Sequence, residues 1–132
     1  MANAIYGLGR ESFLKGEISW DADNIKTVLV DLADYTANLS TDQFLSDIAA
    51  GGRVATSANL ASKTTTLGSA DAADVTFSSV TGDVSEALVI YQDTGSAGTS
   101  RLIAYIDTAT GLPVTPNGGD IQVQWSAPIL TL

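Results

Sequence analysis

The sequence predicts a mainly β chain with a minor helical part: a β-sandwich or small β-barrel with one or two short helices in its N-terminal half. Three observations lead to this fold class. From residue 53 onward, segments rich in Val, Ile and Thr alternate between apolar and polar side chains or run continuously apolar. Turn signals built from Gly, Ser and Asp separate these segments at the short spacing of sandwiches and barrels. Both helical patterns fall before residue 53, and 132 residues fit one β-rich domain over residues 1–132.

Two short helices are expected in the N-terminal half. Residues 3–15 carry apolar side chains at roughly helical spacing, but two internal glycines each cost a helix about 1 kcal/mol relative to Ala. This segment therefore predicts a weak helix or an arm. Farther along, Ser40 and Gln43 have the spacing of a capping box, which predicts a second helix with its apolar face at residues 44–48.

The other ordered segments are expected to be strands. Residues 85–93 and 101–108 are apolar on both faces, which is typical of strands in a sheet that is covered on each side. For a chain this short, we expect the second cover to be a helix or another subunit. The Gly- and Ser-rich residues 93–100 join these two strands as a hairpin connection. The remaining expected strands are residues 18–20, 25–32, 53–60, 64–67, 75–80 and 121–125.

Three segments are candidates for contact with a partner: the N-terminal segment 1–16, the irregular residues 108–120 and the C-terminal tail 128–132. Long irregular loops are more often functional than idle, and we expect the apolar tail to pair as an edge strand or to dock on a neighbour. The alternative of equal weight is that all three segments pack on their own domain. The candidate partner-binding residues are Ile5, Tyr6, Leu8, Phe13, Leu112, Pro113, Val114, Pro116, Ile129, Leu130 and Leu132.

The charge balance limits the classes of partner. The chain has 15 acidic and 6 basic residues, a net charge of −9, and the basic residues are scattered. Nucleic-acid binding depends on clustered Lys and Arg, so we expect no nucleic-acid partner, and the same charge argues against anionic membranes. Only 16% of residues are charged and the mean hydropathy is +0.18. This surplus of apolar residues favours a chain whose surface is partly covered by partners, including copies of itself.

The composition also limits the chemistry. The chain has no Cys and no His, which excludes Ser-His-Asp and Cys-His catalysis and the usual zinc, copper and haem sites. The carboxylates lie mostly where turns and caps are expected, so we expect no enzyme activity and no cofactor. No segment approaches the roughly 20 apolar residues that span a bilayer. The N-terminus lacks a signal-peptide pattern, so we expect the chain to stay in the cytosol where it is made unless an assembly carries it elsewhere.

Two weaker binding patterns have ordinary structural explanations. Asp21 and Asp23 have the spacing of two calcium ligands, but the other ligands of an EF-hand loop are missing and a turn explains them equally well. Trp20 and Trp125, together with four tyrosines, would suit a sugar-binding platform only if they were exposed and coplanar. Most such aromatic residues belong to protein cores. Neither pattern predicts a site.

Several longer stretches resemble a known family. They are AIYGLGRESFLKG at 4–16, NIKTVLVDLADY at 24–35, FLSDI at 44–48, RVA at 53–55, EALVIYQDTG at 86–95 and LIAYIDTATGLPVTPNGGDI at 102–121. Together they resemble a family of small proteins of tailed bacteriophages that are usually found among virion structural genes. The resemblance covers nearly the whole chain, but it carries no catalytic motif and transfers no site residue.

The resemblance implies a virion component that is made in the host cytoplasm. A capsid decoration (cement) protein is the leading hypothesis, because the chain is small, β-rich, acidic and equipped with possible arms. Its expected partners are other virion proteins, with the major capsid protein first, and further copies of itself, with a trimer suggested by capsid geometry. A tail component, such as a tube or tail-associated subunit, is the alternative. A carbohydrate-binding module is the second alternative.

Overall fold

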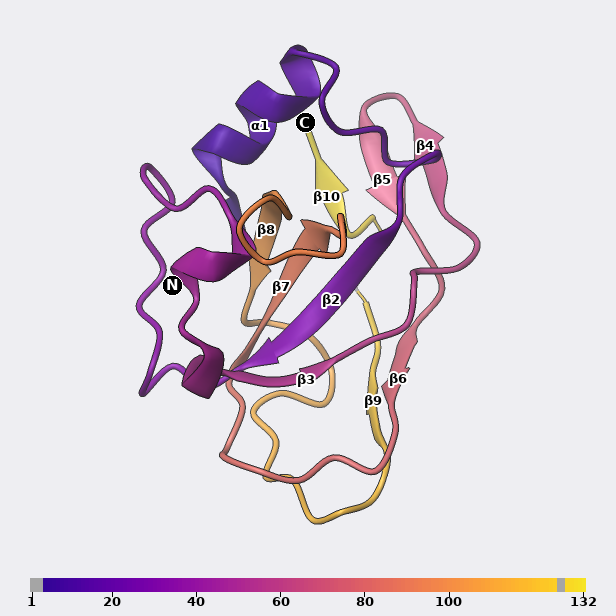
Figure 1. Cartoon of the computed structure of the whole chain (residues 1–132). Coiled ribbons are helices and arrows are strands. Elements are labelled where there is room, and N and C mark those ends of the chain that lie inside the picture. Colours follow the sequence, from indigo (N-terminus) through magenta and orange to yellow (C-terminus); the bar gives the residue numbers. More distant parts are fainter. Residues whose placement is uncertain (1–3, 126–127) are drawn as a thin grey trace.

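The computed structural model describes residues 4–125 and 128–132, which form a mainly β fold similar to a small sandwich (Figure 1). Strands make up 34% and helices 11%, which confirms the predicted fold class. The largest sheet has five antiparallel strands in the order β1-β8-β7-β2-β3. Its strands are β1 (Ala4–Ile5), β2 (Ile25–Val30), β3 (Arg53–Thr56), β7 (Ala87–Gln92) and β8 (Leu102–Ile106).

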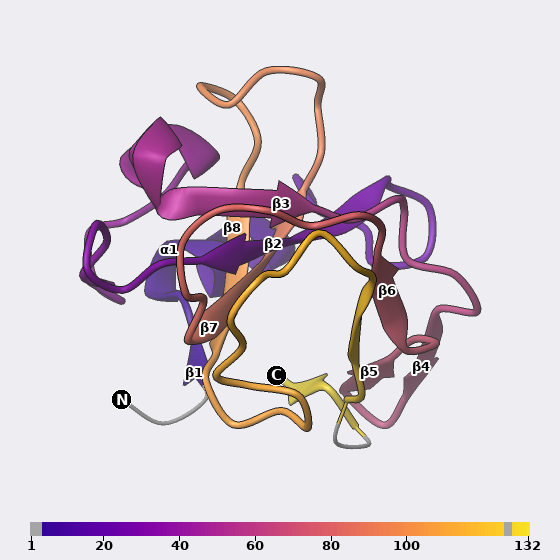
Figure 2. The same ribbon diagram turned by 90° about the horizontal axis from the view of Figure 1, so that it is seen from below.

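Two smaller sheets lie against one face of this large sheet. They have the orders β10-β5-β4 and β6-β9, and their apolar side chains share one core cluster with the large sheet. Figure 2 shows β5 and β6 set apart from β2 across this core, which the side chains fill. The strands are β4 (Thr64–Thr66), β5 (Ser69–Asp71), β6 (Val75–Phe77), β9 (Ile121–Val123) and β10 (Leu130–Thr131).

Helical structure is confined to the N-terminal half of the described residues. The α-helix is α1 (Gly7–Leu14), and two short 3₁₀ turns follow at η1 (Leu45–Asp47) and η2 (Ala50–Gly52). Within residues 4–125 and 128–132, no helix has the length and apolar character needed to cross a membrane. Helix α1 confirms the short helix expected within residues 3–15, but the first described residues of that segment, Ala4–Ile5, form strand β1.

The central strands are apolar on both faces because each face has a cover within the chain. In β7, Leu88 and Ile90 belong to the core cluster shared with the smaller sheets. Val89 points the other way, into a second cluster that the segment between β2 and β3 closes. The expectation of a helix or another subunit as the second cover was wrong, because irregular chain with 3₁₀ turns fills this role. The side chains that this segment buries are Tyr35, Leu45 and Ile48.

Helix α1 packs on β8, and Gly9 makes the contact possible. A Cβ at this position would lie 2.6 Å from the Leu102 carbonyl oxygen, closer than real Cβ contacts. The glycine that weakens the isolated helix therefore allows its backbone to approach the sheet. Figure 1 shows α1 at the end of the molecule near β8 and β10, and Leu14, its last residue, is exposed.

Residues 18–20 do not form the expected strand. Ile18 and Trp20 are both buried, as the alternation indicates. However, the Asp23 carboxylate accepts a hydrogen bond from the Ser19 backbone N–H at 2.8 Å, which holds a turn in place of a strand. Burial of alternate residues is compatible with irregular chain when a side chain supplies the local hydrogen bond.

The expected capping box at Ser40 is also wrong. The 3₁₀ turn begins later, at Leu45. The Asp47 carboxylate accepts hydrogen bonds from the backbone N–H groups of Gln43 and Phe44, at 2.7 and 2.9 Å. The Gln43 N–H, which Ser40 was expected to bind, is therefore satisfied by a carboxylate that reaches back from within the turn.

The long loop and the tail both pack on the domain. The tail forms β10, which pairs with β5 and confirms the expected edge strand. In the loop, Val114 pairs with Ser85, and the Gly118 N–H donates to the Val80 carbonyl at 2.7 Å. The loop is therefore fixed by main-chain hydrogen bonds to its own domain.

Candidate functional site

The predicted partner-binding residues fall into two separate regions. Those of the N-terminal segment and of the tail meet, because β1 and β10 line one hollow and α1 and Leu132 line another. Those of the long loop lie elsewhere, on the side of β9. Tyr6 and Leu130 are buried and Pro113 and Leu132 are exposed, whereas the half-buried residues are Ile5, Leu8, Phe13, Leu112, Val114, Pro116 and Ile129.

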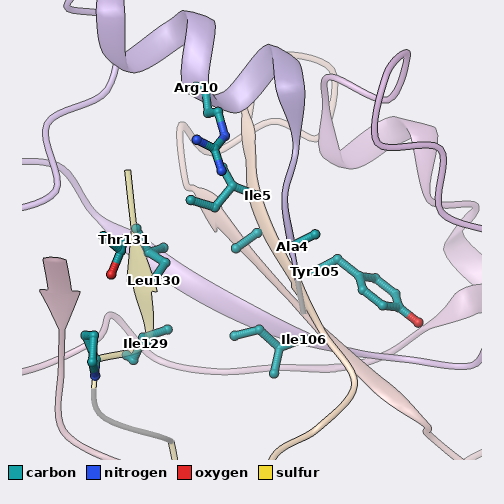
Figure 3. A pocket seen from close by; sticks show the side chains of 10 residues that line it. Ala4, Ile5, Arg10, Tyr105, Ile106, Ile129, Leu130 and Thr131 are labelled. Atoms are coloured by element: carbon teal, nitrogen blue, oxygen red, sulfur yellow. The ribbon is translucent and has the colours of Figure 1, made fainter. Parts of the chain in front are cut away.

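A hollow of about 270 Å³ lies where the N-terminal segment meets the tail. We call it the edge hollow, because it lies between β1 and β10, the outermost strands of their sheets. Figure 3 shows Arg10 extending from α1 toward Ile5, while the ring of Tyr105 points away. The residues whose side chains or backbone define it are Ile5, Arg10, Ile106, Ile129, Leu130 and Thr131.

Three exposed leucines gather at the neighbouring end of the molecule. Leu14 at the end of α1 is 89% exposed, Leu67 in the β4–β5 turn is 100% exposed, and Leu132 is 52% exposed. We call this group the leucine end. Leu132 links its members: it lines a hollow of about 260 Å³ with Leu14, and its backbone N–H donates to the Gly68 carbonyl at 2.9 Å. Phe13 lines this hollow and a further hollow of about 210 Å³.

Leu67 is strained as well as exposed. Its φ angle is +50° and that of Gly68 is +81°, so both residues of this tight hairpin turn have left-handed backbone. Asn, Asp or Gly would suit the first position, whereas a residue with an ordinary Cβ costs about 1–2 kcal/mol there. A leucine at this point neither relaxes the turn nor contributes to the core.

Sequence reasoning missed Leu14, Leu67 and Arg10. Leu67 had a detectable signal, because an apolar residue before Gly68 occupies a turn where polar residues are usual. Leu14 follows Phe13 directly, and its exposure depends on how α1 is rotated about its axis on β8. The position of Arg10 at the edge hollow likewise depends on the docking of the helix.

The acidic residues hold turns. The Asp23 carboxylate accepts hydrogen bonds from the Ser19 N–H and from the Gln92 amide, so the pattern at Asp21 and Asp23 has a structural explanation. A second group brings carboxylate oxygens within 4.8 Å of one another, and its members are Asp31, Asp34 and Asp83. Asp31 accepts a hydrogen bond from the Ala33 N–H at 2.9 Å, and the other two are exposed, as acids at turns commonly are.

The aromatic residues are mostly interior. Trp20 and all four tyrosines are buried. Trp125 is half-buried, and its indole N–H donates a hydrogen bond to the Ala73 carbonyl. The described aromatic side chains therefore form no exposed platform for a sugar ring. Burial raises the pKa of Tyr6 well above its usual value, and burial together with donation to Asp42 does the same for Tyr35. Both phenols stay protonated and serve as hydrogen-bonding parts of the second core cluster.

No protein-family model matches the chain, and no curated protein is significantly similar to it.

Proposed function

We propose that the chain is a structural protein of a tailed-phage virion that decorates the shell by packing its leucine end against the major capsid protein. The leucine end is the observation that carries this proposal, because large apolar side chains grouped on one exposed end are a mark of a protein-contact surface. The phage-family resemblance of the sequence and its low content of charge support the same function.

The energetics favour repeated contacts. Burying one leucine side chain contributes about 1.5–3 kcal/mol, so Leu14, Leu67 and Leu132 together contribute several kcal/mol. Association itself costs about 4–15 kcal/mol, so one such contact would be weak. A homo-oligomer that presents several leucine ends to a symmetric shell would bind far more tightly, since later contacts form at high effective concentration. This supports an oligomer, with a trimer as the first choice.

The net charge sets a condition on the partner surface. At −9 the chain repels other acidic proteins, so the contacted face of the shell should be neutral or basic where it meets the leucine end. Near that end, Lys15 is paired with Glu11 at 2.8 Å within α1. The apolar contact rather than this exposed pair would supply the binding energy.

The test is sedimentation of the purified protein with assembled shells of its capsid protein, using Leu67→Asn and the control Val84→Asn. Both residues are exposed, but Leu67 belongs to the leucine end whereas Val84 lies before β7. Asn also suits the left-handed turn, so the first variant keeps its fold. We expect Leu67→Asn to weaken shell binding by about tenfold or more and Val84→Asn to leave it unchanged.

Equal binding by the two variants, or no binding by the parent protein, would reject the leucine end as the contact. Antibody labelling of intact virions separates the alternative: label on the tail with a bare head would identify a tail component. Label on the head, with loss of shell heat resistance when the protein is absent, would support decoration.

A further inference from the structure

Asn117 is the only asparagine of the chain that is followed by a glycine. Such a pair is chemically labile, because the backbone nitrogen of the glycine can attack the side-chain amide carbon of the asparagine. Glycine has no Cβ, so its nitrogen is easy to approach and its backbone bends freely. The other asparagines of the chain are followed by residues whose side chains hinder this attack, namely Ala4, Ile25, Leu39 and Leu60.

The labile pair lies in the irregular chain between β8 and β9, at the end of the molecule opposite α1 (Figure 1). Asn117 and Gly118 are both exposed, so water reaches the reacting groups. The φ angle of Gly118 is +85°, a left-handed conformation that favours glycine. The turn therefore requires the residue that makes Asn117 labile.

Two hydrogen bonds hold the reacting groups apart in the folded loop. The Gly118 N–H, whose nitrogen is the nucleophile, donates to the Val80 carbonyl at 2.7 Å. The Asn117 Oδ1, which belongs to the amide under attack, accepts a hydrogen bond from the Gly119 N–H at 2.9 Å. Attack requires the Gly118 nitrogen to lose its proton to water and to turn toward the Asn117 Cγ. The bond to Val80 must therefore break first.

The chain at Ser79 and Val80 holds this loop in place, and its outer end is strained. The Val80 N–H donates to the Gly119 carbonyl at 3.0 Å, and the Ser79 N–H donates to the Asp120 carboxylate at 3.0 Å. Ser79 has a φ angle of +50°, which is costly for a residue with a Cβ. Ser79 and Asp120 are both exposed. We therefore expect this end of the loop to open locally without unfolding of the sheets.

We propose that Asn117 is a site of spontaneous deamidation whose rate is set by local opening of this loop. In the open loop the Gly118 nitrogen bonds to the Asn117 Cγ and ammonia leaves, which gives a cyclic succinimide. Water then opens the ring at either carbonyl and yields aspartate or isoaspartate at this position. The reaction consumes one water, releases one ammonia and adds one negative charge to a chain of net charge −9.

The two products affect the loop differently. Aspartate keeps an oxygen that can accept the Gly119 N–H, as the Asn117 Oδ1 does. Isoaspartate places one additional carbon in the main chain before the Gly118 nitrogen, so the Gly118 N–H no longer reaches the Val80 carbonyl in the same register. The isoaspartate product therefore stays open, whereas the aspartate product can close again. This site is separate from the leucine end, so the inference stands or falls independently of shell binding.

The test is incubation of the full-length protein at neutral pH, in native buffer and in urea, followed by peptide mapping with mass spectrometry. We expect deamidation at Asn117, and we expect none at Asn24, Asn38 or Asn59, which serve as internal controls. Deamidation should be about tenfold or more slower in native buffer than in urea, because only the open loop reacts. Hydrogen exchange of the Gly118 amide needs the same opening, so its protection factor should match the ratio of the two rates within about threefold.

Two variants separate the loop contact from charge. Asp120→Ala removes the acceptor of the Ser79 N–H and should raise the rate in native buffer about fivefold, with no change in urea. Asp21→Ala is the matched control: it removes an exposed carboxylate that lies near the Thr65 hydroxyl instead, and it should change neither rate. In urea, where folding plays no part, Gly118→Ala should slow deamidation, because the added Cβ hinders the nucleophile.

Four results would overturn the proposal. Equal rates for the parent protein in native buffer and in urea would show that the bond to Val80 does not protect Asn117. Absence of deamidation in urea would remove the site. Equal acceleration by Asp120→Ala and Asp21→Ala would assign the effect to charge. A native rate that is undetectable in both the parent protein and Asp120→Ala would exclude local opening as the route. If Asp120→Ala does not fold, the rate ratio and the Gly118 exchange of the parent protein decide the question.

Discussion

The hydroxyl oxygen of Tyr6 lies 2.7 Å from the hydroxyl oxygen of Tyr35. Tyr35 in turn donates to the Asp42 carboxylate at 2.7 Å. Tyr6 joins β1 to α1, whereas Tyr35 and Asp42 belong to the irregular segment that covers the second face of the large sheet. These two hydrogen bonds therefore tie the cover of the second face to the N-terminal segment.

Removal of the Tyr35 hydroxyl should cost more stability than removal of the Tyr6 hydroxyl. Tyr35→Phe leaves the Tyr6 hydroxyl buried without its partner, and we expect a loss of about 2–3 kcal/mol in the free energy of unfolding. Tyr6→Phe leaves the bond from Tyr35 to Asp42 intact and should cost about 1 kcal/mol. Urea unfolding measures both. Tyr105→Phe is the control, since the Tyr105 ring points out of the edge hollow and no hydrogen bond involves its hydroxyl among the described residues. An equal loss for all three would contradict the prediction.

The same tyrosines predict alkaline instability. Burial raises the pKa of Tyr6 and Tyr35 in the folded state, while in the unfolded chain tyrosine titrates near pH 10. Above about pH 10 the unfolded state therefore binds fewer protons than the folded state, and stability falls as the pH rises. Each such tyrosine adds a slope of about 1.4 kcal/mol per pH unit. Thermal unfolding between about pH 9 and 11.5 should show this slope, and Tyr6→Phe should make it shallower. A melting temperature independent of pH in this range would refute the assignment.

The ion pair between Lys26 and Asp93 predicts a smaller effect at acid pH. Their charged atoms are 3.0 Å apart, and the hydrogen bond from Lys26 lowers the pKa of the Asp93 carboxyl. A lowered pKa means that the contribution is present above about pH 4 and is lost as the pH falls through the folded-state value. Both side chains are partly in water, so Asp93→Asn should cost only about 0.5–1 kcal/mol near pH 7. The difference from the parent protein should vanish near pH 2. A difference that persists in acid would mean that the carboxylate acts mainly through its backbone contact with Gly95.

Gly9→Ala should destabilise the fold although alanine favours helices. The added Cβ would lie 2.6 Å from the Leu102 carbonyl oxygen, and the backbone must move to relieve the contact. The gain of about 1 kcal/mol in helix propensity is smaller than the cost of overpacking, so we expect a net loss of about 1–3 kcal/mol. Gly98→Ala is the matched control, since its Cβ would meet no atom within 4 Å. Chemical denaturation of the two variants gives the comparison. A stabilised Gly9→Ala protein would show that α1 does not need this close approach.

Much of the fold could be predicted because its signals are local. The apolar runs of β7 and β8 on both faces, and the alternation of β9, reflect burial that each segment shows by itself. The edge pairing of residues 130–131 was also predicted, because an apolar segment is stabilised by a cover. The capping box at Ser40 was misleading, because the Asp47 carboxylate takes the Gln43 backbone N–H and the packing of Leu45 decides where the turn begins.

The candidate site was only partly predictable. The sequence indicated Ile5, Phe13 and Ile129 as contact residues, and the structure places them around the edge hollow and its neighbouring hollows. It gave no sign that Arg10 would extend over β1, or that Leu132 would join Leu14 to the β4–β5 turn. The first depends on how α1 docks on the sheet, and the second links residues 64 to 118 positions apart, so no local pattern records either.

By itself, the sequence determined the β-rich class, the acidic charge and the absence of Cys and His chemistry, because composition and short-range periodicity carry these properties. Only the tertiary structure decided that the covers of the large sheet come from within the chain, and that the N-terminal segment and the tail meet at one hollow. It also decided that leucines from three distant segments share one exposed end. The physical reason is that burial and edge pairing are settled by all elements packing at once, whereas propensity and charge belong to each segment alone.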